Sequence, residues 1–374
     1  MRVRARLFWV ARMENVIVYE LSALGCGPDL EQQLQSHECV ELLARVAAEH
    51  RGSYEILSQA GVGHAQLAGR LRLEAADFGL PGVGDWVVLK NKPVTNCTTI
   101  IERVLIRRTL FTRGAAGREG RAQVIAANVD QVFAVCGLDT DFSIHRIERY
   151  LARIWASGAQ PNVILNKADL CRDATTRVLE IERRVIGVPI YVTSALQSEG
   201  IDAVRECIHP GMTVAFVGSS GAGKSTLVNA LLGEERMPTG AVRAGDGRGC
   251  HVTTHRQLLV LPGGGLLLDT PGMRELQLVD EDGLDAVFGD IAEFASDCRY
   301  RDCRHHTEPG CAVKKAVESG DLTSERLEHF TKLEREAQAY ERRHDEKLRR
   351  QSERKWGQLH DEAARLRHWK GGKQ

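Results

Sequence analysis

The sequence lacks long apolar runs and has no excess of charge of either sign. No stretch reaches the ~18 consecutive apolar residues that a membrane-spanning helix needs, and the basic residues 1–12 hold too short an apolar run for a secretory signal. Lys and Arg number 50, as do Asp and Glu, so the formal net charge is zero. We therefore expect a cytosolic protein without membrane contact, and a nucleic-acid partner has to be argued from local patches. Translation could equally begin at Met13.

Aromatic residues are also scarce, at 5% of 374 residues, but 43% hydrophobic and 27% charged residues are ordinary for a globular protein. Fibrous and wholly disordered chains are thereby excluded. At ~100–200 residues per domain, the length predicts two or three domains. In a reducing compartment, the ten cysteines indicate a metal site wherever they cluster with histidine, rather than disulfides.

The first part of the chain divides into an extension and a β-rich segment. Residues 1–44 show no clear period and are expected to form a variable or partly ordered extension. Within 45–113, short β-rich runs such as 86–89 and 98–105 are separated by glycine turns, and 67–74 alternates in the manner of a strand. Several short strands in about 70 residues favour a small barrel.

The middle of the chain, 114–280, alternates apolar runs with helical stretches. The expected strands are 131–136, 162–165, 189–192 and 212–217, and the expected helices include 145–157 and 174–186. This alternation predicts a parallel α/β sheet covered on both faces. Two further runs, 257–261 and 266–269, flank three glycines and predict a hairpin.

A phosphate-binding motif follows the strand expected at 212–217. It matches G-x-x-x-x-G-K-[ST] and comprises Gly218, Ser219, Ser220, Gly221, Ala222, Gly223, Lys224, Ser225 and Thr226. In such a loop the backbone N–H groups and the helix N-terminus face the phosphates. Lys224 would reach the β- and γ-phosphates, and the hydroxyl of Ser225 would ligate Mg²⁺.

Two further segments predict that the base is guanine. Each follows an expected strand, and they comprise Asn166, Lys167, Ala168 and Asp169, then Ser194 and Ala195. The Asp169 carboxylate can accept hydrogen bonds from both the N1–H and the 2-amino group of guanine. Adenine offers neither donor there, so a buried carboxylate would discriminate strongly against it.

The segment Asp269–Gly272, at the end of the strand expected at 266–268, is typical of a γ-phosphate sensor. Asp269 would hold Mg²⁺ through water, and the Gly272 N–H would meet the γ-phosphate. A switch threonine that ligates Mg²⁺ is expected upstream, and we favour Thr253 over Thr254.

Met273 stands where many GTPases carry a glutamine that orients the attacking water. Methionine cannot do this by hydrogen bonding, so intrinsic hydrolysis should be slow without help from elsewhere. His251 is the candidate for that role, and a solvated switch-loop histidine is the alternative.

The order of these motifs differs from that of ordinary GTPases. Those chains run from P-loop through switch threonine and D-x-x-G to N-K-x-D and Ser-Ala, whereas here N-K-A-D and Ser-Ala come first. The motifs keep the same cyclic order, but the chain begins and ends at a different point. Such a permutation can keep every contact between the motifs, because domain termini usually lie close together. The sequence therefore predicts a circularly permuted P-loop GTPase domain.

A Cys/His cluster lies in the C-terminal part, which spans 281–374. Cys298, Cys303, His305 and Cys311 form a closed Cys₃His set that fits one structural zinc ion. The adjacent His306 could replace His305. An amphipathic helix is expected over 324–350, and residues 341–374 carry a surplus of five positive charges, which suits RNA phosphates unless it is only a solvated face.

These features together resemble the ribosome small-subunit-dependent GTPase A family, to which the run Ile125–Asp130 also points. The similarity covers roughly residues 45–345. It implies a multidomain protein with an N-terminal OB-fold β-barrel, a central circularly permuted P-loop α/β GTPase domain and a C-terminal helical zinc-binding domain. Val252 departs from the family's usual threonine and leaves the assignment of Thr253 in place.

The resemblance also implies late maturation of the 30S subunit and contact with 16S rRNA, with GTP hydrolysis to GDP stimulated by the 30S particle. Two other classes compete: a signalling GTPase or switch with protein partners only, and a nucleotide-binding scaffold without useful turnover. A GTPase assay with and without 30S particles separates the three. No feature of the sequence demands more than a monomer.

Overall fold

The computed structural model describes residues 11–13, 16–50, 52–74, 79–94, 97–113, 123–235, 256–269 and 282–344. The chain forms two compact units. The first comprises residues 1–114 and 121–276, and the second comprises 115–120 and 277–374. No helix in the described ranges is both long and apolar enough to span a bilayer.

The segment before the barrel contains several short elements. They are β1 (Ala11–Met13), β2 (Val16–Val18), η1 (Leu21–Leu24), α1 (Pro28–Glu31) and η2 (Val40–Leu42). Leu24 and Leu30 are fully buried. The sequence predicts a variable or partly ordered extension here, and the portion from Leu21 onward packs as part of the first unit.

Five strands close into a small barrel. They are β3 (Leu43–His50), β4 (Ser53–Ser58), β5 (Gly61–Leu67), β6 (Trp86–Leu89) and β7 (Thr98–Val104). The ring closes because β5 pairs with β7 in parallel while β6 pairs with both β7 and β3. Alternate residues of β5 are buried, as a barrel strand requires, and side chains such as Val46, Ile56 and Ile101 fill the interior.

One expectation within this region is wrong. Residues 69–74, which alternate in the sequence like a strand, form α2 (Gly69–Glu74), and β5 ends at Leu67. A strand pair, β8 (Leu110–Arg113) with β9 (Gln123–Ala127), then precedes the strands of the nucleotide-binding part.

A second sheet forms the core of the nucleotide-binding part. Its order is β12 (Ile190–Val192), β11 (Gln160–Asn166), β10 (Gln131–Gly137), β13 (Thr213–Gly218), β15 (Leu266–Asp269) and β14 (Gln257–Val260). The first five are parallel and β14 is antiparallel to β15, which confirms the expected hairpin. The single pairing of Gln257 with Ala48 joins this sheet to the barrel.

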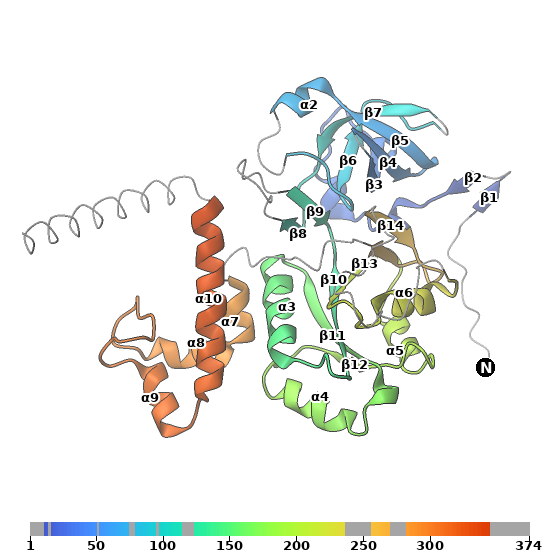
Figure 1. Cartoon of the computed structure of the whole chain (residues 1–374). Helices are drawn as coiled ribbons and strands as arrows, with labels where there is room; N and C mark the ends of the chain where they lie inside the picture. The colour runs from blue at the N-terminus through green and yellow to red at the C-terminus, as the bar shows by residue number, and fades with distance from the viewer. Residues whose placement is uncertain are drawn as a thin grey trace, which may run out of the picture. The chain divides into compact units, whose positions relative to one another are not determined.

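Helices cover this sheet (Figure 1). They are α3 (Ile144–Ala156), η3 (Ala168–Leu170), α4 (Ala174–Glu182), α5 (Ile201–Glu206) and α6 (Lys224–Leu232). Helix α3 packs on β10 and β11, while α5 packs beside α6. The rings of Phe133 and Phe216 stack with centroids 5.1 Å apart between the central strands. All residues of β13 are buried, which explains its continuous apolar run.

The second unit is helical. It contains α7 (Asp282–Val287), α8 (Gly289–Ser296), α9 (Ala312–Ser319) and α10 (Ser324–His344). Phe288 is fully buried and meets the ring of Phe330 edge-on at 5.4 Å. Arg326 donates to both carboxylate oxygens of Asp290, which ties α10 to α8. The Cys/His segment connects α8 to α9.

Candidate functional site: a nucleotide site and a metal centre

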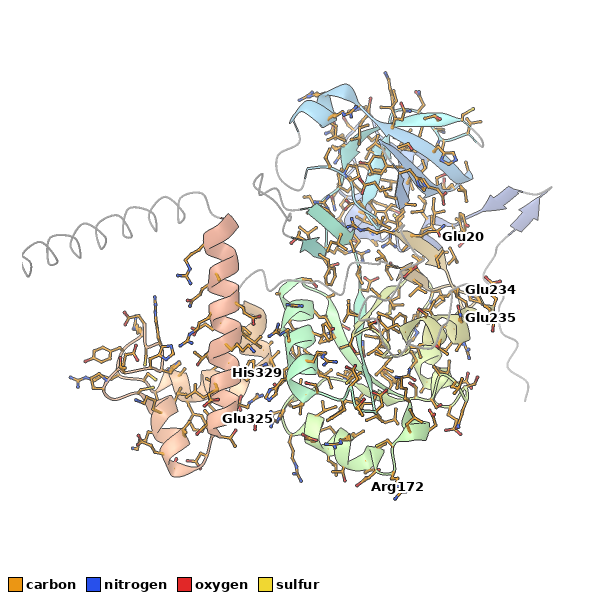
Figure 2. The ribbon with its side chains drawn as sticks, in the orientation of Figure 1. Glu20, Arg172, Glu234, Glu235, Glu325 and His329 are labelled. Atoms are coloured by element: carbon orange, nitrogen blue, oxygen red, sulfur yellow. The ribbon has the colours of Figure 1, made fainter. Side chains whose placement is uncertain are left out.

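The P-loop lies between a buried strand and a helix. Strand β13 ends at Gly218 and α6 begins at Lys224, as the sequence predicts. Glu234 and Glu235, labelled in Figure 2, follow the C-terminal end of α6 at Leu232. The opposite end of α6 adjoins the P-loop, and its free N–H groups carry partial positive charge that would favour phosphate there.

The Lys224 side chain folds back over the loop. Its Nζ donates to the carbonyl oxygens of Gly218 at 2.8 Å and Ser219 at 2.5 Å. An ammonium held in this position can exchange a carbonyl for a phosphate oxygen without a large movement. This is the geometry that a cation serving the β- and γ-phosphates needs.

Asn166 brings the separate motifs together. It is 2% exposed at the end of β11, and its Nδ2 donates to the carbonyl of Ala222 at 2.9 Å. Its Oδ1 accepts from the Thr193 hydroxyl at 3.1 Å and from the Ala195 N–H at 3.0 Å. One side chain thus links three segments that are far apart in the sequence.

Gly223 is required by this arrangement. It has φ = 89°, and a Cβ there would lie 2.2 Å from the Asn166 Nδ2. Any side chain at this position would therefore push Asn166, and the segment Asn166–Asp169 that it begins, away from the phosphate loop.

Asp169 lies next to the Ser-Ala segment. Its Oδ1 accepts a hydrogen bond from the Ser194 hydroxyl at 2.5 Å, which fixes the carboxylate in one orientation. Its other oxygen is the acceptor that base recognition would use. The structure thus places Asn166, Asp169, Ser194, Ala195 and the P-loop at the carboxyl ends of parallel strands of one sheet, β11, β12 and β13, where α/β sheets bind their ligands.

Two acidic residues at the same edge escaped the sequence analysis. Asp139 and Asp141 follow the end of β10, and Asp139 Oδ2 lies 2.5 Å from the Nζ of Lys167. Asp141 accepts a hydrogen bond from the Ser219 hydroxyl. Their position directly after a buried parallel strand could have indicated them as site residues.

Asp269 ends β15, next to the central strand β13. Burial raises the pKa of its carboxyl to about 6. A neighbouring cation would favour the charged form, and carboxylate and hydroxyl oxygens are the hard ligands that Mg²⁺ prefers. The donor set therefore fits magnesium. Gly272, Thr253 and His251 lie outside the described residues.

The C-terminal cluster has the dimensions of a tetrahedral metal site. The ligand atoms of Cys298, Cys303, His305 and Cys311 all lie within 4.8 Å of one another. Cys298 Sγ is 3.9 Å from Cys311 Sγ and 3.7 Å from His305 Nδ1. Ligands about 2.0–2.3 Å from one zinc ion would lie about 3.5–3.8 Å apart, so the residues fit the ion closely.

The two adjacent histidines have different surroundings. His305 adopts φ = 59°, and its Nδ1 lies 3.4 Å from Cys311 Sγ. The Nε2 of His306 instead lies 3.2 Å from an Arg335 guanidinium nitrogen. The geometry therefore favours His305 as the fourth ligand.

Backbone N–H groups support the thiolates. Burial works to raise the pKa of Cys298, but the N–H groups of Val313 and Ala312 donate to its sulfur and bring the pKa below the ordinary value. The Lys314 N–H donates to Cys311 Sγ at 3.4 Å. Such second contacts stabilise the charged form that a metal binds.

A P-loop on a central strand, preceded in the chain by its base-recognition segments, defines the class of the protein: a circularly permuted GTPase. The comparisons make this more specific. The family model described as RsgA GTPase matches residues 104–279. Small ribosomal subunit biogenesis GTPase RsgA of Opitutus terrae is 46% identical over 351 residues, covering 91% of this chain and 96% of that protein. The chain therefore belongs to the RsgA GTPase family and is a GTP-hydrolysing enzyme.

Other relatives agree. Small ribosomal subunit biogenesis GTPase RsgA 1 of Oceanobacillus iheyensis is 43% identical, covering 86% of this chain and 92% of that protein. The solved structure of YjeQ from Thermotoga maritima matches with a TM-score of 0.59 at 28% identity, covering 79% of this chain and 98% of that one. YloQ, described as a circularly permuted GTPase, matches with a TM-score of 0.59 at 25% identity, covering 82% and 98%.

Proposed function

We propose that this chain binds the 30S ribosomal subunit and contacts its 16S rRNA. There it hydrolyses GTP to GDP and phosphate during late 30S maturation, in the cytoplasm and as a monomer. The observation that carries the nucleotide part is the set of hydrogen bonds in which Asn166 donates to Ala222 and accepts from Thr193 and Ala195. The printed names of the relatives, small ribosomal subunit biogenesis GTPases, support the ribosomal part.

The proposed division of labour follows from the chemistry of each group. Asp169 reads guanine, and the loop from Gly218 to Thr226 wraps the phosphates. Lys224 stabilises the negative charge that develops on the β- and γ-phosphate oxygens. Bound magnesium supplies further charge neutralisation there. Ser225 and Thr253 would hold the ion directly, and Asp269 would do so through water.

The attacking water needs an orienting group, because Met273 cannot serve. We propose His251 for this role, with the Gly272 N–H on the γ-phosphate. Because Met273 cannot orient the water, intrinsic hydrolysis would be slow. Slow intrinsic hydrolysis suits an enzyme whose turnover is stimulated by a partner.

We also propose the division into an OB-fold barrel over 45–113, a GTPase domain over 114–280 and a zinc domain over 281–374. The zinc ion would be structural, because Cys₃His leaves no open coordination position. The barrel and the basic residues 341–374 would supply the surfaces for RNA.

The deciding experiment measures GTP turnover by the full chain with and without purified 30S subunits. We expect kcat to rise saturably with 30S, by at least about tenfold, and not with 50S subunits. The Lys224→Ala variant should be inactive under both conditions. Equal turnover with and without 30S would contradict the proposal and favour a switch that acts on protein partners.

A further inference from the structure

The loop between β10 and α3 contacts both halves of the nucleotide site. The Leu138 N–H donates to the backbone carbonyl of Asn166 at 2.8 Å, so the loop is fixed to the segment Asn166–Asp169. Two carboxylates, Asp139 and Asp141, extend from it. Neither belongs to a motif that recognises guanine or phosphate, and each contacts a residue that does.

Asp139 holds the side chain of Lys167. Its Oδ2 lies 2.5 Å from the lysine Nζ, and the two side chains are 24% and 27% exposed. Burial works to raise the pKa of Asp139, but the Lys167 ammonium and the Asp141 N–H outweigh it and lower the pKa. Asp139 is therefore charged at neutral pH and restrains the ammonium.

Gly137 makes room for this carboxylate. A Cβ on Gly137 would lie 2.7 Å from Asp139 Oδ1, and that oxygen accepts from the Asp141 N–H at 3.0 Å. A methyl group at position 137 would therefore displace the carboxylate from its hydrogen bonds. The absence of a side chain here serves the position of Asp139.

Asp141 makes the corresponding contact with the phosphate loop. It accepts a hydrogen bond from the hydroxyl of Ser219, the second residue of the P-loop motif. Its other oxygen pairs with Arg146 from the first turn of α3. One loop thus restrains a lysine beside the base and a serine beside the phosphates.

We propose that Asp139 and Asp141 are positioning residues that set the affinity for guanine nucleotide by acting through Lys167 and Ser219. The inference rests on the proposed guanine site. Lys167 adopts a left-handed backbone conformation, with φ = 65°, which non-glycine residues rarely adopt. Tying its ammonium to Asp139 removes the rotamer freedom that binding would otherwise have to remove.

The test is a double-mutant cycle, measured as GDP affinity by fluorescent-nucleotide titration of the full chain without ribosomes. Asp139→Asn keeps the shape and removes the charge, and we expect it to weaken GDP binding about tenfold. Lys167→Met should weaken binding at least as much. The double variant should be no weaker than Lys167→Met within about twofold, because the carboxylate acts only through the lysine.

Steady-state kinetics separate positioning from a general structural effect. For Asp139→Asn we expect KM for GTP to rise about tenfold while kcat stays within about twofold. Asp141→Asn and Ser219→Ala should form a second, equally non-additive pair. The matched control is Asp202→Asn, which removes an exposed ion pair with Arg205 on α5 and should leave both constants unchanged.

A second set of variants tests the inference even if the asparagine variant misfolds. Gly137→Ala should weaken GDP binding as Asp139→Asn does, but should have no effect in an Asp139→Ala background, where no carboxylate remains to be displaced. Unchanged GDP affinity in Asp139→Asn, or multiplicative effects with Lys167→Met, would overturn this inference but leave the proposed guanine site standing. A wild-type chain that does not prefer GDP to ADP would overturn the proposed guanine site as well.

Discussion

Asn166 makes three hydrogen bonds to segments that lie before and after the point where the permuted chain enters its P-loop. An amide side chain suits this task because it carries two donors and an acceptor oxygen on one rigid plane. The neighbouring Asp169 accepts a hydrogen bond from the Ser194 hydroxyl on its Oδ1. In the proposed site, base selectivity therefore depends on a single carboxylate.

Asp169→Asn should change the base that the site accepts. Xanthine presents a carbonyl where guanine presents its 2-amino group, so an amide donor fits xanthine and an acid does not. We expect GDP affinity to fall by at least about a hundredfold and xanthosine diphosphate to become the preferred ligand. Competition titrations against a fluorescent guanine nucleotide measure both. An undiminished preference for GDP would show that Asp169 does not contact the base.

Elements differ in how much of them the sequence could predict. The strands 131–137 and 213–218 are buried on both faces, and their continuous apolar runs indicated them within one or two residues. The prediction of a strand over residues 69–74 was wrong because short alternating runs fit a helix and a strand equally well. Asp139 was missed because its partner, Lys167, lies on another strand end, and only the register between β10 and β11 brings the two together.

The α8–α9 connection is an element that metal should hold together. Its ligands come from a short segment with few large apolar side chains, so metal binding should supply folding free energy there. His305→Ala should reduce bound zinc from one ion per chain to near zero and lower the thermal midpoint of the second unit. Strong chelators should do the same to the wild type.

The adjacent histidine provides the control. His306 interacts with Arg335 rather than with the thiolates, so His306→Ala should retain zinc and melt near the wild-type temperature. Metal analysis of purified variants decides between them. Zinc retained in His305→Ala but lost in His306→Ala would reverse the ligand assignment.

At the scale of the whole molecule, a buried arginine joins three parts of the first unit. Arg45 on β3 is fully buried and donates to the carbonyls of Leu24, Gly84 and Asn128. Burial lowers its pKa to about 10, so it remains charged at neutral pH. It therefore connects the N-terminal segment and the barrel to Asn128, which precedes β10.

Arg45→Met should destabilise the first unit by about 2–4 kcal/mol, because buried carbonyls lose their donor. Arg45→Lys should be nearly as harmful, since an ammonium cannot span three acceptors as a planar guanidinium does. Thermal or urea unfolding measures the effect. The exposed Arg72 on α2 offers the control, and Arg72→Met should change stability by less than about 0.5 kcal/mol. Equal effects at both positions would contradict a joining role.

The permutation also gives the molecule a mechanical consequence. In an unpermuted GTPase the chain continues from the γ-phosphate sensor into the rest of the same domain, whereas here it runs from Asp269 at the end of β15 toward α7 of the second unit. We therefore propose that a change at the sensor on hydrolysis is transmitted along the chain to the start of the second unit. We expect amide hydrogen exchange in α7 and α8 to differ between the GDP complex and a complex with a non-hydrolysable GTP analogue. The helices α4 and α5, which do not follow the sensor, should exchange alike in both complexes. Identical protection of α7 and α8 in the two states would mean that the covalent connection carries no signal.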